Sequence, residues 1–240
     1  MLKAIQDLVY PPCCAACSRI LPTVHPSAFC PGCWNDIEWV ESPLCRLCGR
    51  AFNKKAGEDS FCGQCLRVPP AYTMARSVVH YTQPVKKLIH QLKYGKNLSA
   101  LQGIFELAGY IDRGRFSEVD YILPVPLHID RLRRRGWNQS ILLAQQFFPE
   151  KKKKIKVDWL IKKENSPEQT GLSGAKRRLN LKTAFALGRK AQLGSSIICL
   201  VDDVFTTGTT VDECSRVIRR AGAKEILVLT LTRADVPNGK

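Results

Sequence analysis

Residues 197–210 constrain the fold of this chain more than any other stretch. Five successive apolar residues, 197–201, predict a strand buried on both faces, as in a parallel sheet covered by helices. Asp202 and Asp203 follow and are predicted to end this strand, and a helical pattern begins at Val211. The hydroxyl-rich turn between them contains Thr206, Thr207, Gly208, Thr209 and Thr210. The stretch therefore predicts a strand–loop–helix unit of an α/β fold.

The loop of this unit has the composition of a phosphate site. The first amides of a helix lack intrahelical acceptors, and the helix dipole favours an anion there. Gly208 allows a tight turn or a close approach to a ligand. The carboxylates of Asp202 and Asp203 would repel a phosphate, so we expect them to accept hydrogen bonds from sugar hydroxyls or to bind Mg²⁺. The pattern indicates a ribose 5-phosphate site, and an ordinary strand–turn–helix with polar capping is the alternative.

The composition fits one α/β domain with a small appendage. The chain has 240 residues, of which 45% are hydrophobic. No apolar run approaches the roughly 20 residues that cross a bilayer. The first ten residues lack the apolar core and cleavage site of a secretory signal, although Leu2, Ile5 and Val9 form a short amphipathic pattern. We expect a cytoplasmic protein without a transmembrane segment.

Positive charge is concentrated in the middle of the chain. The net charge is +16, and residues 130–190 hold 17 Lys and Arg against 5 Asp and Glu, a net of +12. Such a field favours polyanions, either pyrophosphate groups or a nucleic-acid backbone. A solvated basic face is the alternative interpretation.

Eight of the 11 cysteines form four Cys-x-x-Cys pairs near the N-terminus. The pairs are Cys14 with Cys17, Cys30 with Cys33, Cys45 with Cys48, and Cys62 with Cys65. The last two pairs repeat the first two after a shift of 31 or 32 residues, which indicates a duplicated unit. Each unit offers four thiolates, the ligand set of a closed structural Zn²⁺ site.

Disulfides and redox-active dithiols are the competing interpretations of these pairs. The reduced state of thiols in a cytoplasmic setting and the regular spacing both favour zinc. We predict that the first pair joins the second and the third joins the fourth, and crossed pairing is the alternative. Cys13 is left over, or it replaces Cys14 as a ligand.

These cysteines define the expected domain organisation. We predict a double zinc ribbon with a short N-terminal helix over residues 1–70, and an α/β domain over residues 71–240. The proline-containing stretch 67–72 is predicted to be a linker. A domain as small as this ribbon has little apolar core of its own, so metal binding would supply much of its folding free energy.

Local patterns predict the first elements of the α/β domain. Residues 76–81 have strand character, a helix follows Pro84, and a second helix runs over residues 98–111. The four lysines at 151–154 are predicted to form an exposed loop or helix end.

A second buried strand is predicted over residues 119–126. Its end at Val125 and Pro126 would lie at the carboxyl edge of a parallel sheet, where ligands bind in open α/β folds. Arginines follow over 131–135, and their forked guanidinium groups suit a pyrophosphate. Residues 162–180 mix helix breakers with basic residues, as in a mobile lid.

Several motifs occur in order behind the predicted double ribbon. They are Leu-Pro-Val-Pro at 123–126, Arg-Gly-Trp-Asn-Gln at 135–139, Gln-Thr-Gly-Leu-Ser at 169–173, Arg177, Arg178, Asn180 and Val-Asp-Asp-Val-Phe-Thr-Thr-Gly-Thr-Thr at 201–210. The last of these is similar to the phosphoribosyl pyrophosphate (PRPP) signature of type I phosphoribosyltransferases. With all of them present, the chain resembles the ComF family over nearly its whole length.

The resemblance implies a Rossmann-like parallel sheet of the type I phosphoribosyltransferase kind, which binds PRPP with Mg²⁺. It implies that Asp202 and Asp203 are the catalytic pair that holds the ribose hydroxyls, and that residues 206–210 hold the 5-phosphate. The residues implied on the pyrophosphate side are Val125, Pro126, Arg131 and Arg135. The residues expected in the lid or in contact with DNA are Gln169, Lys176, Arg177 and Arg178.

The resemblance also implies a role in natural transformation, in which the protein handles single-stranded DNA on the cytoplasmic side of the membrane. A DNA-uptake helicase or a membrane channel is the expected kind of protein partner. One alternative is an active phosphoribosyltransferase of nucleobase salvage, which releases pyrophosphate from PRPP. Another is a zinc-ribbon interaction module whose PRPP site is vestigial.

Overall fold

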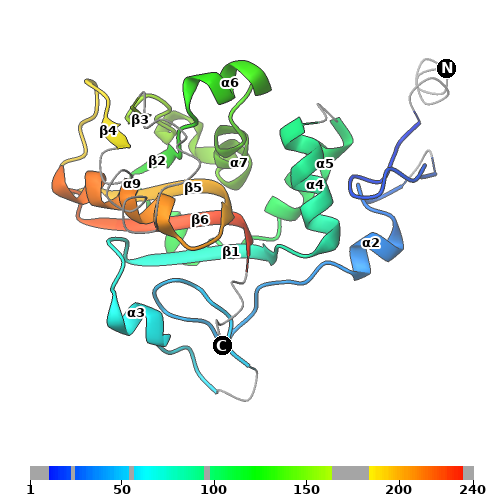
Figure 1. Cartoon of the computed structure of the whole chain (residues 1–240), viewed down its shortest axis with the longest axis horizontal. Helices are drawn as coiled ribbons and strands as arrows, with labels where there is room; N and C mark the ends of the chain where they lie inside the picture. Colours follow the sequence, from blue (N-terminus) through cyan, green and yellow to red (C-terminus); the bar gives the residue numbers. More distant parts are fainter. Residues whose placement is uncertain (1–10, 23–24, 54–56, 95–97, 164–183, 235–240) are drawn as a thin grey trace, which may run out of the picture.

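The computed structural model describes residues 11–22, 25–53, 57–94, 98–163 and 184–234 (Figure 1). Two expectations fall outside these ranges. They are the short N-terminal helix and the lid that would contain Gln169, Lys176, Arg177 and Arg178.

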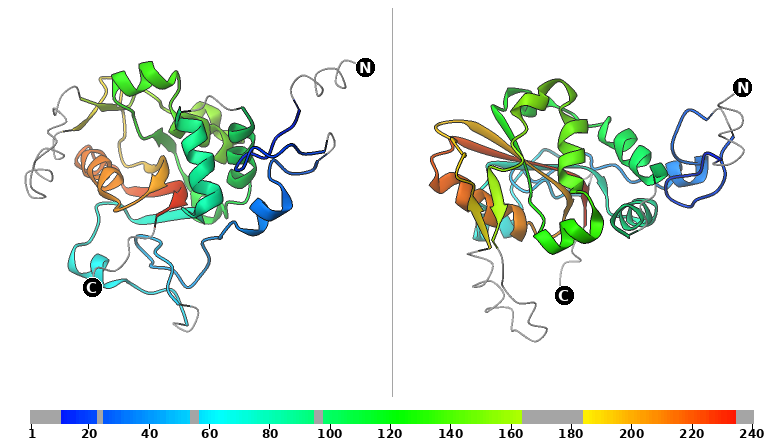
Figure 2. Two further views of the ribbon diagram at one scale, coloured as in Figure 1. Left: turned by 45° about the vertical axis from the view of Figure 1, so that its right-hand side comes forward. Right: turned by 90° about the horizontal axis from the view of Figure 1, so that it is seen from above.

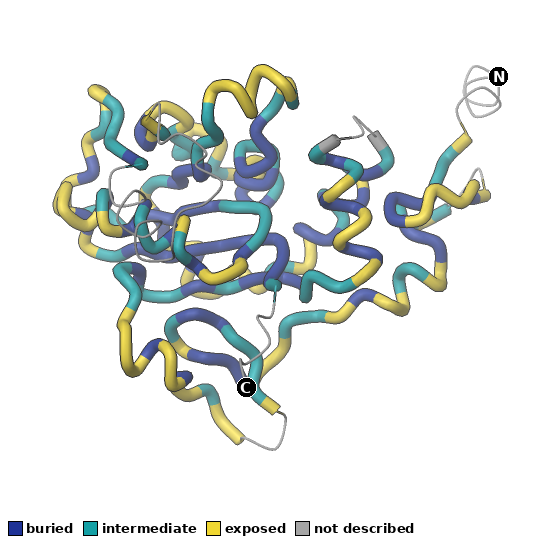
Figure 3. Tube along the Cα trace, viewed as in Figure 1, coloured by how far each residue is buried: buried dark blue, intermediate teal, exposed yellow. Residues whose placement is uncertain are grey.

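A four-stranded parallel sheet forms the centre of the molecule, in the order β1-β6-β5-β2. The strands are β1 (Met74–His80), β2 (Tyr121–Pro124), β5 (Ile197–Phe205) and β6 (Glu225–Arg233). The central strand β6 is buried at eight of its nine positions, and β5 is buried over residues 198–201 and at Phe205. The tube drawing in Figure 3 shows much of these two strands in dark blue. The expected α/β class with a parallel sheet is therefore confirmed.

The strand that carries the two acids is longer than its apolar run predicts. Pairing with β6 continues past Val201, because Asp202 lies opposite Thr230 and Phe205 lies opposite Arg233. The prediction that the acids end the strand is therefore wrong. Parallel hydrogen bonding to the buried strand β6 keeps Asp202 and Asp203 in the strand conformation, although aspartate has little strand preference of its own.

Helices cover both faces of the sheet. On one face lie α4 (Gln83–Tyr94), α5 (Leu98–Ala108) and α7 (Gln139–Phe147), which share an apolar core with Cys199 and Leu229. On the other face lies α9 (Thr209–Arg220), whose Cys214 and Ile218 pack with Leu200 and Val228. Alternate residues of each central strand thus face opposite cores, as two-sided burial requires.

Shorter elements complete the described chain. They are the helices α2 (Pro31–Asn35), α3 (Gly63–Arg67) and α6 (Ile129–Arg135), the 3₁₀ helices η2 (Gly114–Glu118) and η3 (Pro149–Lys154), and an antiparallel pair formed by β3 (Leu160–Lys162) and β4 (Phe185–Leu187). The lysine run lies in η3 and is only partly exposed. Lys151 and Lys154 donate through Nζ to the carbonyls of Ser117 and Val119, so these two lysines fasten η3 to the approach to β2.

The two cysteine units dock at separate places on the α/β domain (Figures 1 and 2). The first unit packs against α4 and α5, where a Cβ on Gly103 would come within 2.5 Å of the Ala15 Cβ. The second packs against the edge strand β1, where Ala75 N donates to Leu47 O at 2.6 Å. The apolar residues of each unit therefore pack in a core that they share with the α/β domain. An independent domain over residues 1–70 stays a prediction.

Gly49 permits the close approach of the second unit to β1. Its φ is +69°, and an added Cβ would lie 2.4 Å from the carbonyl oxygen of Ala75. Gly57 in the same unit has a φ of +80°, but an added Cβ there would meet nothing within 4 Å. A substitution at Gly57 therefore costs only the free energy of the left-handed backbone, whereas one at Gly49 adds the free energy of the clash with Ala75.

We predict that Gly49→Ala lowers the free energy of unfolding by about 1–3 kcal/mol more than Gly57→Ala, because overpacking adds to backbone strain. Chemical denaturation of the two variants measures the difference. Equal losses in both variants would contradict the docking described here.

Candidate functional site

The eight paired cysteines form two separate four-thiol clusters. One contains Cys14, Cys17, Cys30 and Cys33, and the other contains Cys45, Cys48, Cys62 and Cys65, with all sulfur atoms of a cluster within 4.8 Å of one another. The predicted sequential pairing is confirmed, and Cys13 lies outside both clusters, where its Sγ donates to Pro11 O.

The distances within the clusters fit zinc. Four sulfurs placed about 2.3 Å from a tetrahedral Zn²⁺ lie about 3.8 Å apart. The Sγ atoms of Cys17 and Cys30 are 3.8 Å apart, and so are those of Cys48 and Cys62. The chain therefore has two zinc-ribbon sites of four cysteines each, and their geometry matches a closed structural ion.

The electrostatics of the clusters also fit a cation. Burial raises the pKa of Cys14 and Cys45, but backbone amides within each ribbon outweigh burial and bring both values to about 7. Burial and the neighbouring thiols raise the pKa of Cys33 and Cys65 far above the usual range. A bound Zn²⁺ would relieve this crowding of negative charge, because it binds thiolates directly.

The first prediction for these sites concerns metal content. Native mass spectrometry should find two zinc ions in the wild type and in Cys13→Ser, because Cys13 lies outside both clusters. It should find one ion in Cys48→Ser, because Cys48 belongs to the second cluster. Cys48→Ser should also unfold at a lower temperature, because zinc binding contributes to folding free energy. Two ions in Cys48→Ser would contradict the assignment.

The two acids of the predicted ribose site lie at the carboxyl end of β5 and face different helices. Asp202 Oδ1 accepts from Ser140 Oγ of α7 at 3.1 Å and from the amide of Asp203 at 2.9 Å. Asp203 Oδ2 lies 2.6 Å from Lys93 Nζ of α4. Burial and the neighbouring Asp203 carboxylate raise the pKa of Asp202 to about 7.

The loop after β5 combines a left-handed glycine with exposed hydroxyls. Gly208 has a φ of 76° and caps α9, which begins at Thr209, two residues earlier than the sequence pattern predicts. A Cβ on Gly208 would lie 2.6 Å from the Phe205 ring. The Oγ1 atoms of Thr207 and Thr209 are 2.7 Å apart, and Thr206, Thr207 and Thr210 are exposed. The arrangement suits an anion at the start of α9.

The predicted pyrophosphate side is only partly assembled. The amide of Val125 donates to Val201 O, and Pro126 has no amide, so neither residue offers a backbone donor to a ligand. Arg131 is exposed on α6, and Arg135 Nη1 donates to Gln139 Oε1 at 3.4 Å. Of the four residues predicted for this side, only the two arginines can therefore donate to a pyrophosphate.

Sequence reasoning missed the residues that hold this region in place. Asn138 accepts from Ser140 N as the cap of α7 and donates to Val125 O at 3.0 Å, which ties the helix to the residue that follows β2. An Asn before a helical pattern is a capping signal. No sequence signal identifies Lys93 or Ser140 as partners of the acids, because these contacts join distant segments.

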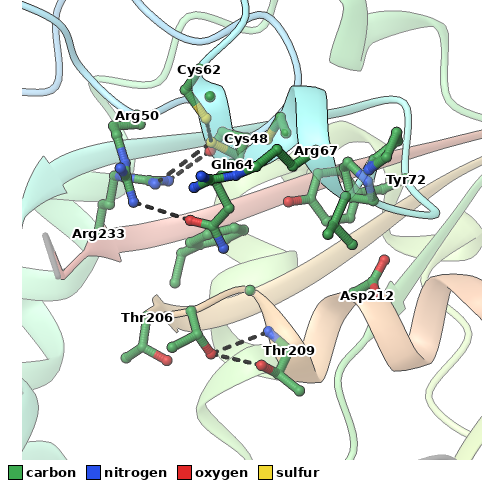
Figure 4. Close-up of a pocket in the computed structure, with 18 of the residues that line it drawn as sticks. Cys48, Arg50, Cys62, Gln64, Arg67, Tyr72, Thr206, Thr209, Asp212 and Arg233 are labelled. Atoms are coloured by element: carbon green, nitrogen blue, oxygen red, sulfur yellow. Dashed lines mark hydrogen bonds between the residues drawn. The ribbon is translucent and has the colours of Figure 1, made fainter. Parts of the chain in front are cut away.

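A cleft lies between the loop and the second cysteine unit (Figure 4). Its volume is about 1240 Å³. One wall comes from the loop and the first turns of α9, and the other comes from the ribbon around α3. Arg233 Nη1 donates to Cys48 O at 2.6 Å and its guanidinium lies 4.7 Å from the Phe205 ring, so Arg233 joins the two walls.

The parallel sheet and the two four-thiol clusters define an α/β protein with a double zinc ribbon. The family model described as a double zinc ribbon domain matches residues 5–66. Among the described residues, no helix is long and apolar enough to cross a membrane.

Comparison with known proteins identifies relatives over most of the chain. Competence protein F of Haemophilus influenzae is 34% identical over 220 residues, which cover 87% of this chain and 91% of that protein. DNA utilization protein YhgH of Escherichia coli K12 is 34% identical over 72% of this chain and 77% of its own length. Competence protein ComFC of Streptococcus pneumoniae is 23% identical, with coverages of 80% and 89%. The chain belongs to the ComF/YhgH competence family.

A solved structure is also similar, but weakly. The allosteric regulatory enzyme of purine biosynthesis aligns with a TM-score of 0.34 and 19% identity, over 67% of this chain and 29% of that chain. A likeness at this level carries no argument about the site.

Proposed function

We propose that this protein binds PRPP with Mg²⁺ at the end of β5 and handles single-stranded DNA during natural transformation. The observation that carries the PRPP part is the loop geometry, in which two acids precede a left-handed glycine and exposed threonines at the start of α9. The names of the relatives, which refer to competence and to DNA utilization, support the DNA part.

The proposed roles follow from the chemistry of each group. Threonine hydroxyls and the first amides of α9 would hold the 5-phosphate. Asp202 and Asp203 would accept hydrogen bonds from the ribose hydroxyls or bind the Mg²⁺ that accompanies PRPP. Arg131 and Arg135 are the candidate contacts of the pyrophosphate. The protein would act on the cytoplasmic side of the membrane, with a DNA-uptake helicase or channel as its protein partner.

Calorimetric titration of PRPP with Mg²⁺ tests the site. Asp202→Asn should bind at least about tenfold more weakly than the wild type at pH 8, since charge-assisted hydrogen bonds contribute about 1.5–3 kcal/mol. Asp120→Asn, which removes a charge at the opposite end of β5, is the control and should bind like the wild type. Equal affinity of Asp202→Asn and the wild type at pH 8 would contradict the proposal.

The raised pKa of Asp202 predicts a pH dependence. The carboxylate loses its proton as pH rises through about 7, and only the ionised form attracts Mg²⁺. Wild-type affinity should therefore increase between pH 6 and pH 8 by more than that of Asp202→Asn. The titration of PRPP itself affects both proteins equally, so it cancels when the affinities of the wild type and Asp202→Asn are compared. If the two affinities changed with pH in parallel, Asp202 would be excluded as the titrating group.

A further inference from the structure

We propose that the cleft between the second cysteine unit and the phosphate loop is the binding site for single-stranded DNA. The inference rests on the proposed function, because it assigns to one surface the DNA contact proposed above. It concerns a different part of the molecule from the basic segment 130–190.

The size of the cleft exceeds what a phosphosugar needs. Its volume is about 1240 Å³, whereas pockets for small ligands usually measure about 300–1,000 Å³. The cleft begins at Thr206 and Thr207 and extends along the ribbon to Val68 and Pro69. A ligand on the loop therefore leaves room for a longer, chain-like occupant beside it.

The charge of the cleft suits a phosphate backbone. Arg50 and Arg67 come from the ribbon wall, whereas the α9 wall contributes Arg216 together with the acids Asp212 and Glu213. The excess of cations therefore lies on the ribbon wall. Arg67 is exposed, and its side chain has no hydrogen-bond or ion-pair partner among the described residues. The opposing Asp212 is already engaged, because its two oxygens accept from Ala71 N at 2.6 Å and from Arg216 Nη2 at 2.9 Å.

The ribbon wall also presents apolar side chains to solvent. Val68 is 68% exposed and lines the cleft. Leu66 and Phe61 are 65% and 46% exposed on the same ribbon, outside the lining of the cleft. Single-stranded DNA combines an anionic backbone with unstacked bases that have apolar faces, and proteins bind it with cationic grooves and apolar or aromatic contacts. A duplex hides those faces, and a free phosphate has none.

The two walls are held in a fixed relative position before any ligand binds. Arg233 is 3% exposed, donates to Cys48 O and lies over the Phe205 ring. The Tyr72 ring meets the Phe205 ring edge-on at 6.3 Å. These buried contacts form the floor of the cleft, so binding does not have to order its walls.

The basic segment 130–190 offers the rival surface. Its exposed arginines on α6 lie at the opposite side of the molecule from α3 (Figure 1). Their summed charge attracts DNA at long range. The cleft differs because arginines of two converging walls lie beside the exposed Val68 of the ribbon wall.

The test compares two double variants, each of which loses two positive charges. Arg50→Ala with Arg67→Ala removes two cations from the cleft, and Arg133→Ala with Arg134→Ala removes two from α6. Fluorescence anisotropy measures the binding of a labelled oligodeoxythymidylate to the full-length, zinc-loaded protein across a salt titration. The cleft variant should bind about tenfold more weakly, and its plot of the logarithm of the binding constant against the logarithm of the salt concentration should be shallower by about 1–2. The affinity of the α6 variant should stay within about twofold of the wild-type affinity.

Zinc content and thermal unfolding establish that both variants are folded. If the wild type binds and the α6 variant loses as much affinity as the cleft variant, the assignment of the cleft is wrong, while the proposed function stands. If the wild type itself binds weakly at low salt and its affinity does not change with salt, the DNA part of the proposed function is wrong as well.

Discussion

The contact between Arg233 and the second cysteine unit is the constraint on which the candidate site depends. Arg233 ends β6, donates to Cys48 O and lies over Phe205, whose ring supports the left-handed Gly208. The second four-thiol cluster is thereby connected to the turn at Gly208 through two side chains. The ribbon forms part of the site, because without it the loop would have no opposing wall.

Local features of the fold could be predicted from the sequence. The apolar run of β5, the glycine turn and the spacing of the cysteine pairs each depend on neighbouring residues, and the structure has the central strand, the left-handed Gly208 and the sequential pairing. The end of β5 could not be predicted, because pairing with β6 extends the strand through Asp202 and Asp203. The contacts of Lys151 and Lys154 in η3 could not be predicted either, since their carbonyl acceptors lie more than thirty residues away in the sequence.

The environment of the acids could not be predicted from the sequence for the same reason. Ser140 and Asp202 are 62 residues apart, and Arg233 and Cys48 are 185 apart. Such contacts exist only after the sheet has brought α4 and α7 to the end of β5. The separate docking of the two cysteine units could not be predicted either, because it depends on close approaches at Gly49 and Gly103. Nothing in the sequence distinguishes these two glycines from the others.

The central claim is that a phosphosugar binds at the start of α9. Hydrogen exchange with and without PRPP and Mg²⁺ tests it most directly, because amides that hold a phosphate become protected. We predict slower exchange over residues 206–212 in the wild type and a smaller effect in Asp202→Asn. Protection elsewhere in the molecule, with residues 206–212 unchanged at saturating PRPP, would contradict it.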